Sequence, residues 1–101
     1  MQIWLNDRLV DATSAGIALD GWPDGDGIFE TIKTEDGEIF ELGRHMRRAI
    51  DAAEKKGISL PAEDLIRNGI SQLLAVEPHS IGRLRLLFST GRFVAVHHLY
   101  E

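Results

Sequence analysis

The sequence predicts an α+β fold in which an antiparallel sheet packs against two helices. Short segments with alternating or β-branched residues occur near both ends of the chain, at 3–10, 28–41 and 83–99. Between them lie two segments with apolar residues repeating at offsets of three and four. The order of strands, helices and strands, without an internal repeat or linker, is typical of one α+β domain of 101 residues.

The first predicted element is a short hairpin. Residues 3–5 and 8–10 are mostly apolar and flank Asn6 and Asp7, two residue types that tolerate positive φ in a tight turn. Residues 11–26 carry three glycines and one proline without a sustained period, which indicates a loop across the surface. Loops of this kind often carry function.

A second hairpin and a helix follow. The β-branched segment 28–34 is joined to residues 38–41 through Glu35-Asp36-Gly37, which is a turn signal. From residue 42 an apolar stripe predicts a helix that ends at Gly57. The stripe consists of Leu42, Met46, Ala49, Ile50 and Ala53.

A second helix and two strands complete the predicted fold. Pro61 suits the first position of a helix, and Gly69 weakens that helix by about 1 kcal/mol relative to Ala. Alternation then predicts a strand at 83–88, whose even-numbered residues are apolar, and a last strand at 93–99. The apolar face of the second helix consists of Leu65, Ile66, Ile70, Leu73 and Leu74.

Composition narrows the function classes. The formal net charge of −5 argues against binding to a nucleic-acid backbone. There is no cysteine, and no apolar run approaches the roughly 20 residues of a membrane span, so we expect neither a thiolate metal site nor a membrane segment. The first residues lack the pattern of a secretory signal, which predicts a cytoplasmic protein. His97 and His98 would point to opposite faces of a strand, so we expect no metal site there.

Arg48 is a candidate anchor for an anion. An arginine fork matches phosphate oxygens bidentately and stays charged at every working pH. Arg48 lies about 200° around the helix axis from Met46, so it points away from the apolar stripe. A solvated arginine on a helix surface fits the same pattern, and spacing alone leaves both interpretations open.

Two further cations share a strand face. Arg83 and Arg85 are about 7 Å apart along the predicted strand, on the side opposite its apolar residues. This arrangement fits a receptor for a carboxylate, and it also fits an edge strand protected by charge. Glu30 and Asp26 are interpreted as hairpin and surface carboxylates without a catalytic role.

Three segments together resemble one enzyme family. The run Gly25-Asp26-Gly27-Ile28-Phe29-Glu30-Thr31, the pattern His45-Met46-Arg47-Arg48 and the pair Arg83-Leu84-Arg85 are similar in order and spacing to the small N-terminal domain of class IV pyridoxal-phosphate enzymes. That family includes branched-chain and D-amino-acid aminotransferases and 4-amino-4-deoxychorismate lyases. The resemblance implies that residues 1–101 form this small domain, an antiparallel sheet with two helices.

The resemblance also implies a role for each candidate residue. Arg48 would bind the phosphate of pyridoxal 5′-phosphate, since it matches the arginine of the family's H-x-x-R-L pattern. Arg85 would contact the substrate carboxylate, and Arg83 beside it would suit a small anionic, amino-acid-like substrate. Phe29 would line the substrate pocket, and a place in the core fits Phe29 equally well.

The family's catalytic lysine lies in a larger C-terminal domain, and none of Lys33, Lys55 and Lys56 matches its position. The resemblance therefore covers the first third to half of a full-length relative, and it implies a homodimer that is inactive without the missing C-terminal large domain. The G-D-G-I-F-E-T element is closest to the lyase branch, which splits aminodeoxychorismate into 4-aminobenzoate and pyruvate. The alternatives are a fragment of a branched-chain or D-amino-acid aminotransferase and a stand-alone binding or assembly domain.

Overall fold

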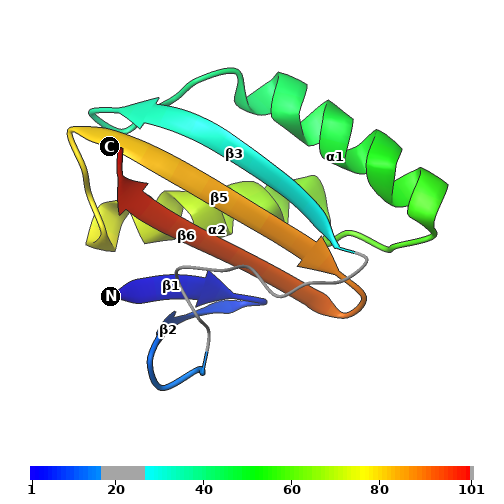
Figure 1. The fold of residues 1–101 in the computed structure, drawn as a ribbon, viewed down its shortest axis with the longest axis horizontal. Coiled ribbons are helices and arrows are strands. Elements are labelled where there is room, and N and C mark those ends of the chain that lie inside the picture. Colours follow the sequence, from blue (N-terminus) through cyan, green and yellow to red (C-terminus); the bar gives the residue numbers. More distant parts are fainter. Residues whose placement is uncertain (17–26, 101) are drawn as a thin grey trace.

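The predicted α+β architecture is confirmed by a computed structural model, which describes residues 1–16 and 27–100. Its strands form one sheet in the order β2-β1-β6-β5-β3-β4, with every pair antiparallel. The helices are α1 (Leu42–Lys56) and α2 (Glu63–Val76); α2 lies behind β5 and β6, and α1 runs beside β3 (Figure 1). The strands are β1 (Gln2–Leu5), β2 (Arg8–Asp11), β3 (Ile28–Glu35), β4 (Glu38–Ile39), β5 (Ile81–Ser89) and β6 (Arg92–Leu99).

The predicted turns have the residues that their backbone requires. Asn6, between β1 and β2, has a φ of 58°. Asp36 and Gly37, between β3 and β4, have φ values of 48° and 85°, the combination of a two-residue type I′ hairpin. Helix α1 ends as predicted at Gly57, whose φ of 70° gives the left-handed cap that glycine adopts without strain.

The main core lies between the sheet and the two helices. Ile28 and Ile32 of β3 pack there with Met46 of α1 and Ile70 of α2. Two predicted core positions are wrong, since Ile50 is 42% exposed and Leu65 is 59% exposed. Each helix covers the sheet with one narrow stripe, and these two residues lie beside it. Within the described part of the chain, neither helix is long and apolar enough to cross a membrane.

Gly69 is a packing position rather than a weak point of α2. A Cβ built on Gly69 would lie 2.5 Å from Nε1 and 2.6 Å from Cε2 of Trp4. The indole of Trp4 has little room to move, because it is 4% exposed and its Nε1 donates a hydrogen bond to the carbonyl oxygen of Asn6 at 3.1 Å. Helix α2 can therefore approach β1 this closely because residue 69 has no side chain.

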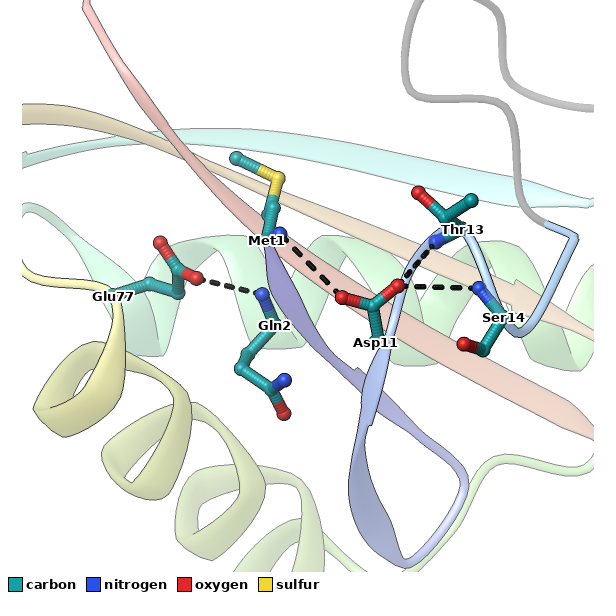
Figure 2. Close-up of polar contacts among 6 residues, drawn as sticks. All are labelled: Met1, Gln2, Asp11, Thr13, Ser14 and Glu77. Carbon is teal, nitrogen blue, oxygen red and sulfur yellow. Dashed lines mark hydrogen bonds and ion pairs between the residues drawn. The ribbon is translucent and has the colours of Figure 1, made fainter.

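Two carboxylates stabilise the N-terminal hairpin by accepting hydrogen bonds from backbone N–H groups (Figure 2). The Asp11 carboxylate accepts hydrogen bonds from the backbone N–H groups of Ser14 at 3.2 Å and Thr13 at 3.0 Å, and these bonds lower the pKa of Asp11. The Glu77 carboxylate, just after α2, accepts a hydrogen bond from the Gln2 backbone N–H at 2.6 Å. The hairpin is thus bound both to the turn that follows β2 and to the end of α2.

The sheet face away from the helices carries a second, smaller apolar cluster. Ile3, Leu87 and Val94 are buried there together with Val96 and Ala12. The alternation of β5 places Arg83 and Arg85 on this same face, as predicted, because Leu84, Leu86 and Phe88 point into the main core. We call the side of the sheet that carries these arginines the open face.

Candidate functional site

A shallow pocket lies where β3 pairs with β5. The strand register pairs Thr31 with Arg85 and Phe29 with Leu87, so Phe29 and Arg85 are diagonal neighbours on the open face. Phe29 is 43% exposed, and its alternative place in the core is wrong because Ile28 and not Phe29 points toward the helices. The pocket has a volume of about 280 Å³ and is lined by Phe29, Glu30, Thr31, Arg85 and Leu86.

The open face gathers basic side chains although the chain as a whole is acidic, with a net charge of −5. Arg83 lies two residues before Arg85, and the register places Lys33 and His98 beside Arg83 on the two neighbouring strands. Burial and, next, the charge of Arg83 lower the pKa of Arg85. Because like charges facing each other across strands destabilise a sheet, a bound anion would relieve repulsion here.

Aromatic rings accompany these cations. The Arg83 guanidinium carbon lies 5.1 Å from the ring centroid of Tyr100, and the Lys33 ammonium lies 6.0 Å from the same centroid and 5.5 Å from that of Phe40. The negative face of an aromatic ring attracts a cation without neutralising it, so the positive charge stays available to a ligand. Lys33 was not predicted as a site residue. Alternate residues of a strand share one face of the sheet, so the even spacing between Phe29 and Lys33 could have identified Lys33 as a neighbour of the site.

His97 and His98 lie on opposite faces of β6, as predicted. His97 is 1% exposed; its Nδ1 donates to the carbonyl oxygen of Glu77 at 2.6 Å, which leaves Nε2 to accept from the Thr34 hydroxyl at 2.7 Å. Burial lowers the pKa of His97 and that of His98, and Arg85 and Arg83 lower the latter further. His97 is a structural link between β6, β3 and the end of α2.

Arg48 points outward from α1, as its helical position predicts, and its side chain is 67% exposed. Its Nε lies 4.0 Å from Oε1 of Glu30. This contact is made by Nε, the guanidinium nitrogen nearest the aliphatic part of the side chain. It leaves out the two terminal nitrogens, which can bind two phosphate oxygens at once. The donor set therefore fits a phosphate. The described lining of the pocket does not include Arg48, which lies on the helix side of β3.

Glu30 is buried, so its interpretation as a surface carboxylate is wrong. It is 8% exposed, and its Oε1 is 2.6 Å from Nδ1 of His45 on α1. The alternation of β3 explains the error, because Glu30 has the same parity as Ile28 and Ile32 and must point toward the helices. This alternation could have predicted that Glu30 points toward α1, where it contacts His45. Residues 25 and 26 of the glycine-containing run lie outside the described residues.

The fold and the site define a class of protein: an α+β domain with a cationic sheet face and an exposed arginine on the neighbouring helix. The sequence model of the family described as amino-transferase class IV matches residues 27–96 of this chain. The chain belongs to that family, as the resemblance of its three segments predicted.

Curated relatives carry aminotransferase names. A protein of Methanocaldococcus jannaschii, provisionally named branched-chain-amino-acid aminotransferase, is 38% identical over 95 residues, which cover 90% of this chain and 33% of that protein. A D-alanine aminotransferase of Listeria innocua is 27% identical over 94 residues, covering 90% of this chain and 32% of the relative. The chain therefore spans about a third of the length of these relatives.

Solved structures show the same fold. The branched-chain amino acid aminotransferase from Escherichia coli superposes with a TM-score of 0.81 at 18% identity, covering 98% of this chain and 41% of that one. A crystallised protein provisionally named 4-amino-4-deoxychorismate lyase gives a TM-score of 0.69 at 23% identity, covering 83% of this chain and 39% of that one. At these identities the superpositions establish the fold, which is that of the small N-terminal domain of class IV enzymes.

Proposed function

We propose that residues 1–101 are the small domain of a pyridoxal-phosphate enzyme and contribute its anion-binding residues. The observation that carries the proposal is the pocket between Phe29 and Arg85, on the cationic face of a domain whose family is generally pyridoxal-phosphate dependent. The proposal includes a larger C-terminal domain as partner, because none of the lysines of this chain matches the family's catalytic lysine. Under this proposal the 101 residues have no catalytic activity without the larger domain.

Each candidate residue has one task in this proposal. Arg48 binds the phosphate of the cofactor through its two terminal nitrogens. When it is bound, the cofactor supplies an electron sink for bond breaking beside the substrate's amino group. Arg85 binds the substrate carboxylate at the pocket, and the exposed ring of Phe29 packs against the substrate and excludes water.

The charge of the open face favours one substrate class. Arg83 and Lys33 lie beyond Arg85, so the face can bind a second carboxylate as well as the first. This favours aminodeoxychorismate as substrate, with 4-aminobenzoate and pyruvate as products. Amino transfer to a branched-chain or D-amino acid is the second candidate, and it is supported by the aminotransferase names of the curated relatives.

Exposed apolar side chains favour a partner surface at one end of the sheet. Ile81, Leu99, Tyr100 and Phe40 are each 36% exposed or more, and the Tyr100 N–H bonds to the Ile81 carbonyl at 2.9 Å. A surface of this kind is suited to packing against the proposed large domain or a second copy of the chain. Sedimentation of the isolated chain as a monomer at high concentration would contradict self-association and with it the stand-alone assembly alternative.

A chimera tests the proposal. In it, these 101 residues replace the matching third of the Listeria D-alanine aminotransferase, which supplies the large domain. Release of pyruvate from aminodeoxychorismate would support the lyase, and amino transfer to 2-oxoacids would support the second candidate. A folded, cofactor-loaded chimera with neither activity would refute the proposal. Arg67→Ala, on the exposed face of α2, is the control for nonspecific loss of charge.

A further inference from the structure

Glu30 and His45 form a largely buried, hydrogen-bonded pair next to Arg48. We propose that this pair is a positioning device, which holds the Arg48 guanidinium in the direction that an incoming phosphate requires. The inference rests on the proposed role of Arg48 as phosphate ligand. Neither Glu30 nor His45 touches the ligand in this scheme, so both are positioning residues and act through Arg48.

The geometry joins the three side chains through one oxygen atom. Oε1 of Glu30 is 2.6 Å from Nδ1 of His45 and 4.0 Å from Nε of Arg48. His45 and Arg48 are three residues apart on α1, so their side chains are neighbours on the surface of the helix. The Glu30 side chain is 8% exposed and that of His45 is 21% exposed, which keeps the carboxylate in one place. Arg48 is 67% exposed, and its described ion-pair contact is with this carboxylate.

Two effects of Glu30 on phosphate binding have opposite signs. A fixed carboxylate restricts the rotamers of Arg48 before the ligand arrives, so less conformational entropy is lost on binding. The same negative charge repels a phosphate, but a phosphate at the exposed end of Arg48 would lie farther from Glu30 than the guanidinium does, and water and salt there would screen the repulsion. Positioning therefore outweighs repulsion, and removing the charge of Glu30 weakens phosphate binding. If Glu30 acted only as a nearby negative charge, removing that charge would strengthen phosphate binding.

A pair of probes isolates the phosphate contribution. Pyridoxine 5′-phosphate and pyridoxine both lack the aldehyde that reacts with lysines. The dissociation constant of pyridoxine divided by that of pyridoxine 5′-phosphate, measured for the 101-residue chain, gives what the phosphate adds to affinity. NMR titration measures both constants. Glu30→Gln is expected to lower this ratio about threefold or more. An unchanged or higher ratio overturns the inference. Glu63→Gln is the matched control, since it removes the same charge beside Arg67 on α2.

Variants of His45 supply a second test. His45→Ala leaves Glu30 without its donor and is expected to lower the ratio as Glu30→Gln does. His45→Asn keeps an N–H group close to the position of Nδ1 and is expected to restore the ratio. Equal ratios for the two His45 variants overturn the inference. These variants carry the test should Glu30→Gln fail to fold.

The motion of Arg48 gives a readout that needs no ligand. The Nε–H order parameter of Arg48, measured by NMR relaxation, should exceed that of exposed Arg44 on the same helix and fall to the level of Arg44 in Glu30→Gln. No difference between the two arginines in the wild-type chain overturns the inference. Arg48→Ala separates the two proposals: an unchanged ratio refutes the phosphate role itself. If Arg48→Ala lowers the ratio and Glu30→Gln does not, the positioning inference alone fails.

Discussion

Gly69→Ala tests whether close packing or helix propensity decides the stability of this domain. In an isolated helix the substitution stabilises by about 1 kcal/mol, because glycine loses more backbone entropy on folding than alanine does. Here the new methyl group would lie 2.5 Å from Nε1 of Trp4, well inside van der Waals contact. Overpacking of this kind costs about 1–3 kcal/mol, and moving the indole would also weaken its hydrogen bond to Asn6, worth about 1 kcal/mol. The net effect is a loss of about 1–3 kcal/mol.

The measurement is urea unfolding of the wild-type chain and two variants. Gly43→Ala is the matched control, because its Cβ would meet only the flexible end of Arg47, at 3.8 Å, among the described atoms. We expect Gly43→Ala to leave the urea midpoint unchanged or raise it, and Gly69→Ala to lower the midpoint by about 0.3–1 M urea per kcal/mol lost. A Gly69→Ala variant as stable as the wild type would show that α2 shifts freely on β1 and would refute the packing argument.

Three further predictions follow from the polar contacts. Burial lowers the folded-state pKa of His97 and His98 below the usual value of about 6.5, so the unfolded chain binds more protons and stability falls as the pH drops below about 6.5. Urea unfolding between pH 8 and 5 should show a slope of at most about 1.4 kcal/mol per pH unit for each histidine; a flat profile would contradict this. Thr34→Val removes the donor to His97 Nε2 and should cost about 1–3 kcal/mol, whereas Thr34→Ser should cost less; equal losses in denaturation experiments would speak against the hydrogen bond. In the chimera, Arg85→Ala should raise KM for the substrate by about ten- to a hundredfold with little change in cofactor affinity, and Arg48→Ala should do the reverse; equal effects would undo the role assignment.

The elements of the fold could be predicted because local signals determine them. Asn6, Asp36 and Gly37 specify tight turns, and Gly57 closes α1 in the conformation that the sequence indicates. The depth of burial could not be predicted in the same way, because it depends on which stripe of each helix meets the sheet. Leu65 has the offset of a core residue and is nevertheless exposed, since α2 packs through Gly69 against Trp4. That contact joins residues far apart in the sequence, so no local pattern predicts it.

The candidate site was predictable where it follows strand parity. Parity places Arg83 and Arg85 together, and the register of β3 with β5 adds Lys33 and Phe29 to the same face. The register was not available from the sequence, because no local signal indicates how the hairpin that contains β3 pairs with the hairpin that contains β5. Tyr100 was missed for the same reason, since it reaches Lys33 of β3 only after β5, the neighbour of β6, pairs with β3.

Strand β3 explains how one short segment can contribute to both proposed anion-binding sites. Its alternation sends Glu30 toward α1, where it meets His45 and Arg48, and sends Phe29 and Thr31 to the open face. A one-residue slip of β3 would therefore bury Phe29 and expose Glu30, and would dismantle both elements at once. The apolar positions Ile28 and Ile32 oppose such a slip, because it would also remove them from the core. The residues that stabilise the fold thus also fix the geometry of the proposed phosphate and carboxylate sites.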